Sequence, residues 1–141
     1  QRDGSGDFAA NVITATATTA RYADLAEIYG ADEAIEPGTV VHFVGEGKVA
    51  PCDKADCSAV AGVISTAPAY LMNNEADGVA VALAGRVPCK VAGGCKAGDL
   101  LVSAGNGEAK MSADPKPGTI IGKALHDMDN DGMCEIMAIM M

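Results

Sequence analysis

A short acidic run near the end of the chain, HDMDNDGMCE, has the residue types of a cation site. Asp127, Asp129 and Asp131 alternate before Gly132, as in the first half of a D-x-D-x-D-G calcium loop, where carboxylates on a tight turn converge on a hard cation. The twelfth position of such a loop is Ala138, which offers no ligand, so the run is not an EF-hand. We weigh Ca²⁺ at the three aspartates against a plain hairpin turn, and the Asn-Asp-Gly sequence favours the turn.

Thiols are the second set of residues that could do chemistry. The chain has five cysteines, which are Cys52, Cys57, Cys89, Cys95 and Cys134. Neither close pair has the Cys-x-x-Cys spacing of a zinc knuckle, and the two histidines, His42 and His126, lie far from them in the sequence. The pattern favours reduced, buried thiols in a protein made in a reducing cytosol over a metal–thiolate site. A local disulfide within each close pair stays open for an oxidising medium.

No set of catalytic residues emerges from the sequence. Ser65 follows an expected strand, but a serine nucleophile needs a base and an oxyanion hole, and neither histidine lies in a recognisable motif. The glycine-rich AGGCKAGD contains Lys96 but lacks the Walker pattern, so it is interpreted as a turn. The pair Asn73-Asn74 is interpreted as a polar loop. We therefore expect no catalytic residues, no cofactor and no enzyme activity.

The composition excludes several classes of partner. The net charge of −9 argues against a nucleic-acid surface and against binding to anionic lipid, because both need clustered Lys and Arg. No apolar stretch reaches the roughly 18 residues of a membrane span, and the start carries no signal-peptide core. Apolar residues make up 49% of the chain and aromatic residues 4%, so we expect a core of Val, Ile, Leu, Ala and Met.

The elements that must position these residues are mostly strands. Runs of four to eight residues rich in Val, Ile and Leu are bounded by Gly, Pro, Asn or Asp, which is typical of a β-barrel or sandwich. We expect one short helix at Tyr22–Tyr29. The last run, CEIMAIMM, is apolar on both faces, so we expect a central or interface strand that pairs with GTIIGKAL and is covered on both sides.

The first residues, RDGSGDFAANVITATATTA, cannot build a core because Phe8, Val12 and Ile13 are their only sizeable apolar groups. An isolated strand leaves its backbone groups unpaired, whereas several copies wound about one axis bury a small apolar face per chain. The strip is therefore interpreted as a fibrous shaft segment of a homo-oligomer. The alternative is a disordered linker.

The sequence resembles the C-terminal tip of tailed-bacteriophage tail fibres, at the junction of shaft and head. RDGSGDF and ITATATTA are similar to shaft repeats, and the head-like motifs are ARYADLAEIY, EPGTVV, AGVISTAPAYLMN, ALAGRVPCKV, KAGDLLVS and GTIIGKAL. The resemblance implies a short trimeric shaft over residues 1–20, a collar with a short helix over 21–36, and a compact all-β head, a barrel or sandwich, over 37–141.

The resemblance also implies a function. The chain is expected to be a homotrimeric virion protein, made in the host cytoplasm, that binds a host cell-surface polysaccharide or lipopolysaccharide during adsorption. It does not single out the receptor-binding residues. A weaker similarity of YADLAE and the strands after it to phage autoproteolytic domains leaves an alternative, an intramolecular chaperone that trimerises the fibre and cleaves itself off.

Overall fold

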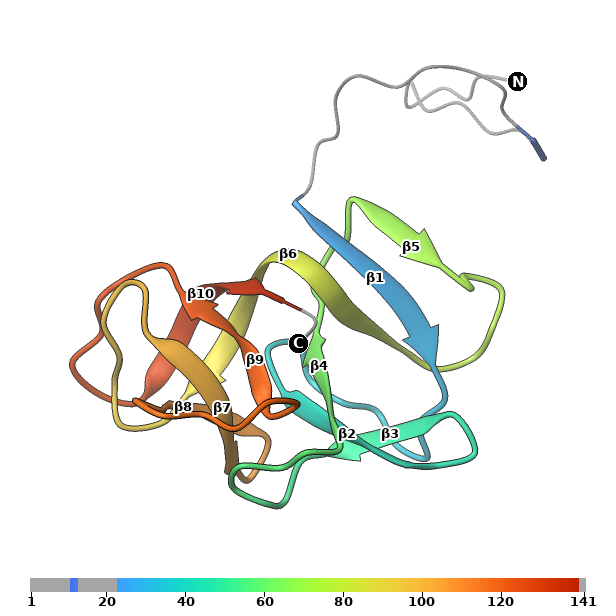
Figure 1. The fold of residues 1–141 in the computed structure, drawn as a ribbon. Coiled ribbons are helices and arrows are strands. Elements are labelled where there is room, and N and C mark those ends of the chain that lie inside the picture. The colour runs from blue at the N-terminus through green and yellow to red at the C-terminus, as the bar shows by residue number, and fades with distance from the viewer. Residues whose placement is uncertain (1–10, 13–22, 140–141) are drawn as a thin grey trace.

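The computed structural model describes residues 11–12 and 23–139, and the second of these segments is built of β-strands (Figure 1). In chain order the strands are β1 (Asp24–Tyr29), β2 (Val40–Gly45), β3 (Lys48–Pro51), β4 (Val60–Ile64), β5 (Tyr70–Met72), β6 (Val79–Val91), β7 (Leu100–Gly105), β8 (Glu108–Met111), β9 (Ile120–Ala124) and β10 (Gly132–Ala138). The prediction of an all-β barrel or sandwich is confirmed. Within these residues we find no helix long and apolar enough to cross a bilayer.

Five strands in the C-terminal half close into a barrel. The order around it is β6, β10, β9, β7, β8 and back to β6. The second half of β6 pairs with β10 antiparallel, from Val91 opposite Gly132 to Gly85 opposite Ala138. The barrel closes where Val91 of β6 pairs in parallel with Ala109 of β8.

A second ring of five strands occupies the N-terminal half. Here β1, the first half of β6, β4, β2 and β3 are neighbours in that order. A parallel bridge between Gly30, just after β1, and Lys48 of β3 completes the ring. The short strand β5 pairs in parallel with β1 outside this ring. The two rings share the long strand β6, which curves through the centre of the molecule (Figure 1).

The two halves are structural repeats that lie 60 residues apart. Strands β2, β3 and β4 correspond in position and length to β7, β8 and β9. In the β2–β3 and β7–β8 hairpins the pairing register shifts after the third paired residue. The glycine-containing turns of the two hairpins place Glu46 and Asn106, respectively, at positive φ. The backbone bond from Ile64 N to Thr39 O recurs from Ala124 N to Asp99 O, at 3.0 Å in both halves. The head is therefore a duplicated barrel, an organisation that the sequence analysis did not predict.

Gly85 marks the point where β6 passes from one barrel to the other. Its φ of +101° is unfavourable for any residue with a side chain, and a Cβ there would lie 2.3 Å from the carbonyl oxygen of Ala23. Because Gly85 permits this bend, the sequence patterns VAVALAG and RVPCKV form one continuous strand of 13 residues.

The core follows the duplication. The first barrel buries a cluster of Val41, Val49, Ile64 and Val81. The corresponding residues of the second barrel, Leu101, Ala109, Ala124 and Ile136, belong to the larger buried cluster, which also takes in all five cysteines. Burying an aliphatic side chain of this size contributes about 1.5–3 kcal/mol, so both clusters stabilise the fold.

The expected helix at Tyr22–Tyr29 is wrong for the residues described, because Asp24–Tyr29 is strand β1. The segment pairs with β6 along its whole length and buries Ala26 completely. Six residues are too few to distinguish helical from strand periodicity. The segment is a strand because β5 pairs with one of its edges and β6 with the other. The expected boundary between residues 36 and 37 consequently cuts through the first barrel. The expected shaft lies almost wholly outside the described residues.

The β7–β8 hairpin docks on the loop that follows β3. Backbone amides of Asp56 and Cys57 donate to the carbonyl and the hydroxyl oxygen of Ser103, both at 2.9 Å. Gly107 in the hairpin turn accepts from Val40 N and donates to Cys52 O. The corresponding hairpin of the first barrel has no such cover, and its residues 43–47 are exposed.

The prediction for the last strand is partly confirmed. β10 pairs with β9, in the GTIIGKAL segment, and its other edge pairs with β6. Cys134, Ile136 and Ala138 are buried on one face. The expected apolar cover of the other face is not supplied by this chain, because Met133 and Met137 on that face are 54% and 42% exposed. A barrel needs only its inner face filled, so the outer one can remain in solvent.

Candidate functional site

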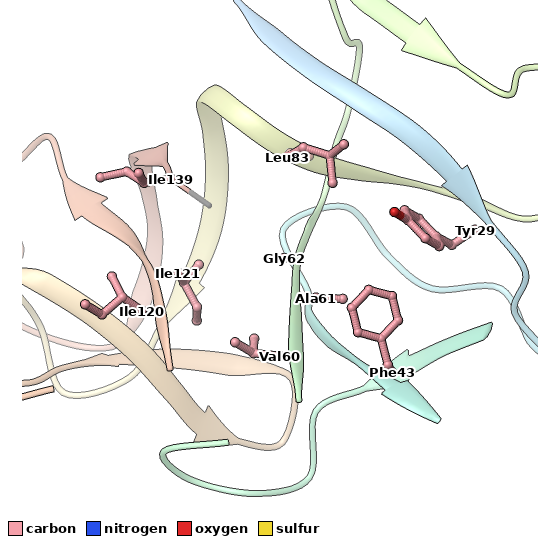
Figure 2. Close-up of a pocket in the computed structure, with 10 residues that line it drawn as sticks. Tyr29, Phe43, Val60, Ala61, Gly62, Leu83, Ile120, Ile121 and Ile139 are labelled. Atoms are coloured by element: carbon pink, nitrogen blue, oxygen red, sulfur yellow. The ribbon is translucent and has the colours of Figure 1, made fainter. Parts of the chain in front are cut away.

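An apolar pocket of about 320 Å³ lies between the two barrels (Figure 2). Strands β1, β2, β4, β6 and β9 contribute to it, together with the residue after β10. The lining residues are Tyr29, Phe43, Val60, Ala61, Gly62, Ala82, Leu83, Ile120, Ile121 and Ile139. With one hydroxyl and no charged side chain, this lining is suited to apolar packing rather than to binding a charged ligand.

Two aromatic rings form one rim of the pocket. Tyr29 and Phe43 meet edge to face, with ring centroids 5.6 Å apart. The Tyr29 hydroxyl donates to Glu27 at 2.9 Å, and partial burial and this carboxylate raise the pKa of the tyrosine. Phe43 remains 45% exposed, although the duplicated position in the second barrel, Ser103, is fully buried. The first barrel therefore presents an apolar surface where the second has an internal contact.

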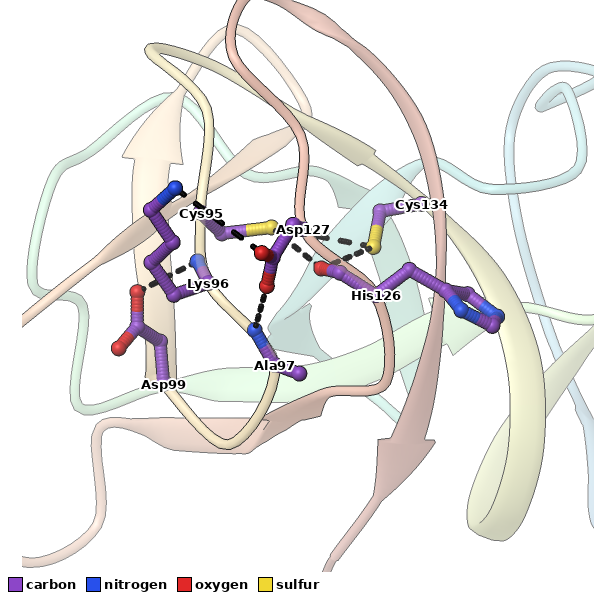
Figure 3. Close-up of polar contacts among 7 residues, drawn as sticks. All are labelled: Cys95, Lys96, Ala97, Asp99, His126, Asp127 and Cys134. Carbon is purple, nitrogen blue, oxygen red and sulfur yellow. Dashed lines mark hydrogen bonds and ion pairs between the residues drawn. The ribbon is translucent and has the colours of Figure 1, made fainter.

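The aspartates of the HDMDNDG run hold a neighbouring loop. Asp127 accepts a hydrogen bond from the amide of Ala97 at 2.9 Å and lies 4.0 Å from the ammonium of Lys96 (Figure 3). Asp131 accepts from the amide of Gly93 at 2.6 Å. Both carboxylates thus accept hydrogen bonds from backbone amides of the loop between β6 and β7, and these long-range contacts give the two aspartates a structural role.

The calcium prediction at Asp127, Asp129 and Asp131 gains no support from this arrangement. Within residues 11–12 and 23–139, one group of three His, Cys, Asp or Glu residues has ligand atoms close enough to share an ion, and it contains none of these aspartates. The run lies between β9 and β10, as the hairpin-turn interpretation expects.

Three cysteines lie together in the core of the second barrel. Cys134 is directly opposite Cys89 on β6, and its sulfur lies 3.8 Å from that of Cys95. The Cys95 and Cys134 thiols both donate to the carbonyl oxygen of His126 (Figure 3). Burial and the neighbouring thiols raise the pKa of Cys89 to about 12 and that of Cys95 to about 11. Because the thiolate is the reactive form, these raised pKa values lower the reactivity of Cys89 and Cys95 at neutral pH.

A second cysteine cluster includes a histidine that sequence spacing had separated from it. Atoms of His42, Cys52 and Cys57 that can bind a metal lie within 4.8 Å of one another. The hairpin brings them together, since His42 on β2 pairs with Ala50 on β3 and Cys52 follows two residues later. Asp53 lies at the edge of the cluster, with a carboxylate oxygen 3.9 Å from His42 Nε2. The Gly-Glu-Gly turn between two Val-rich runs is the sequence signal that pairs residues 42 and 50.

The residues considered for catalysis occupy structural positions. The Ser65 hydroxyl donates to the buried carboxylate of Asp24 at 2.6 Å, which ties β1 to the end of β4. Asn73 adopts a positive φ and donates to Ile28 O, as a turn residue does. Lys96 is exposed beside Asp127. These contacts bring neither histidine to Ser65.

Comparisons with known proteins find similar folds among solved structures. No protein-family model and no curated protein matches the sequence. Among solved structures, the pre-mature gene product 12 of bacteriophage phi29 has a similar fold, with a TM-score of 0.64 and 15% identity over 95% of this chain. The head fibre gp8.5 N base of the same phage gives a TM-score of 0.46 with 15% identity, covering 81% of this chain and 92% of that one. This chain spans 23% of gene product 12, so the likeness concerns the fold of one region of that protein.

Proposed function

We propose that the chain is the tip of a homotrimeric bacteriophage tail fibre, a structural virion component that binds a polysaccharide or lipopolysaccharide on the host surface. The observation that carries this proposal is the position of the duplicated barrel, whose fold is similar to a region of a phage protein, directly behind a strip that resembles fibre-shaft repeats. A strip without a core needs partner copies, and a compact barrel keeps three thin chains in register.

The oligomeric state is the first prediction. Light scattering of the full chain at micromolar concentration is expected to give the mass of three copies of the 14.2-kDa protein. Because shaft strands depend on one another, removal of residues 1–20 should lower the stability of the trimer. A monomer with the N-terminal strip intact would contradict the proposal.

The apolar pocket is proposed as a contact between copies, because Phe43 at its rim is exposed, whereas Ser103, the duplicated position in the second barrel, already makes an internal contact. We expect Phe43→Glu to convert the trimer to a folded monomer, since a carboxylate placed in an apolar contact loses its hydration without a partner. Met111→Glu is the matched control, because Met111 is 47% exposed and lies outside the pocket. Sedimentation of the two variants, with circular dichroism to verify folding, makes the comparison. If the two substitutions have equal effects on the trimer, the pocket is not part of the interface between copies.

Receptor binding is tested with the purified trimer on an array of bacterial capsular polysaccharides and lipopolysaccharides. We expect retention on one neutral or amino-sugar polymer, because the net charge of −9 disfavours anionic ones. If the trimer binds none and does not compete with whole-phage adsorption, the head is a cap without a receptor.

A denaturing gel of the full fibre is expected to show one band, and two stoichiometric fragments would instead indicate a self-cleaving chaperone domain.

A further inference from the structure

We propose that His42, Cys52 and Cys57 form a zinc-binding site. Their ligand atoms lie within 4.8 Å of one another, a spacing that needs only a small contraction around an ion. Two sulfur ligands and one imidazole are the donor set of tetrahedral Zn²⁺ sites, whereas Ca²⁺ and Mg²⁺ require oxygen ligands. The proposed function makes no use of this cluster, so the inference is independent of it.

The surroundings of the cluster are those of a structural site. Both cysteines are free and buried, with 0% of Cys52 and 8% of Cys57 exposed, and the His42 side chain is mostly buried. Asp53 is 72% exposed and 3.9 Å from His42 Nε2. Its carboxylate can move to supply the fourth ligand or orient the imidazole as an outer hydrogen-bond partner.

The position of the cluster explains what a metal would do for this fold. Cys52 and Cys57 lie at the two ends of the loop on which the second barrel docks. The docking contacts are the hydrogen bonds from the amides of Asp56 and Cys57 to Ser103. His42 belongs to a strand of the first barrel. One ion bound by all three residues therefore fixes the docking loop to the first barrel and couples the folding of the two barrels.

Metal titration of the reduced full-length protein under anaerobic conditions tests the proposal. We expect one Zn²⁺ per chain and a rise in the melting temperature, because an ion that binds only the folded state stabilises it. Substitution by Co²⁺ should give the thiolate-to-metal absorption and the strong visible bands of a tetrahedral site. His42→Ala and Cys57→Ser should each weaken binding by more than the roughly 10- to 100-fold that loss of an outer-shell partner causes, and Asp53→Asn should weaken it within that range.

The Cys95→Ser/Cys134→Ser double variant is the control for metal binding at the other thiol cluster, and it should keep full affinity. Circular dichroism must show that each variant is folded. If Cys57→Ser does not fold, the His42→Ala variant alone tests the proposal, because loss of the imidazole leaves both thiols in place. Absence of Zn²⁺ binding at micromolar concentration overturns the proposal. So does binding that survives His42→Ala, or binding that is lost in the double variant.

Discussion

Deletion of residues 136–141 is expected to leave no folded, soluble protein. Strand β10 pairs with β6 on one edge and with β9 on the other, so the deletion opens the second barrel. It also removes Ile136, which is fully buried. Loss of one such side chain costs about 2–5 kcal/mol, against a net stability of roughly 5–15 kcal/mol for a whole domain. Soluble yield, circular dichroism and thermal unfolding measure the result.

A graded version of this experiment separates the inner face from the outer face of β10. Ile136→Ala should lower the free energy of unfolding by about 2–5 kcal/mol. Met137→Ala, one residue further and 42% exposed, should change it by no more than about 0.5 kcal/mol. A truncated protein that stays soluble with unchanged thermal stability would show that β10 is peripheral.

The alkaline stability of the protein should depend on Cys89. Burial raises the pKa of this thiol from 9.0 to about 12. Between these values the unfolded chain releases the proton and the folded chain keeps it. The contribution to stability is therefore complete below pH 9 and is lost as the pH rises towards 12, at about 1.4 kcal/mol per pH unit, or about 4 kcal/mol in total.

Urea unfolding of the wild type and of Cys89→Ala at a series of pH values from about 8 to 10.5 measures this contribution, because both chains share every other titrating group. The variant should be less stable at neutral pH because of the cavity. We expect the difference between the two proteins to shrink as the pH rises above 9. Parallel pH profiles would mean that the Cys89 thiol ionises as easily in the folded state as in the unfolded chain.

The sequence by itself determined the class of fold. Runs of Val, Ile and Leu between Gly, Pro and Asp are local signals, since period-2 burial and turn chemistry both act over a few residues. The pairing of CEIMAIMM with GTIIGKAL was also predictable, because the Asn-Asp-Gly sequence between them indicates a turn. The paired Gly-x-Gly turns at residues 45–47 and 105–107 are a local signal of the duplication as well.

Only the tertiary structure decided how distant residues meet. Asp24–Tyr29 is a strand because β5 and β6 pair with its two edges, and no local pattern of six residues fixes that choice. The aspartates of the last loop bind backbone amides of residues 93–97, and the proximity of these two loops follows from barrel closure. His42 joins Cys52 and Cys57 for the same kind of reason, since strand pairing sets which side chains become neighbours. Chemistry that depends on converging side chains therefore emerged only once the barrels were formed.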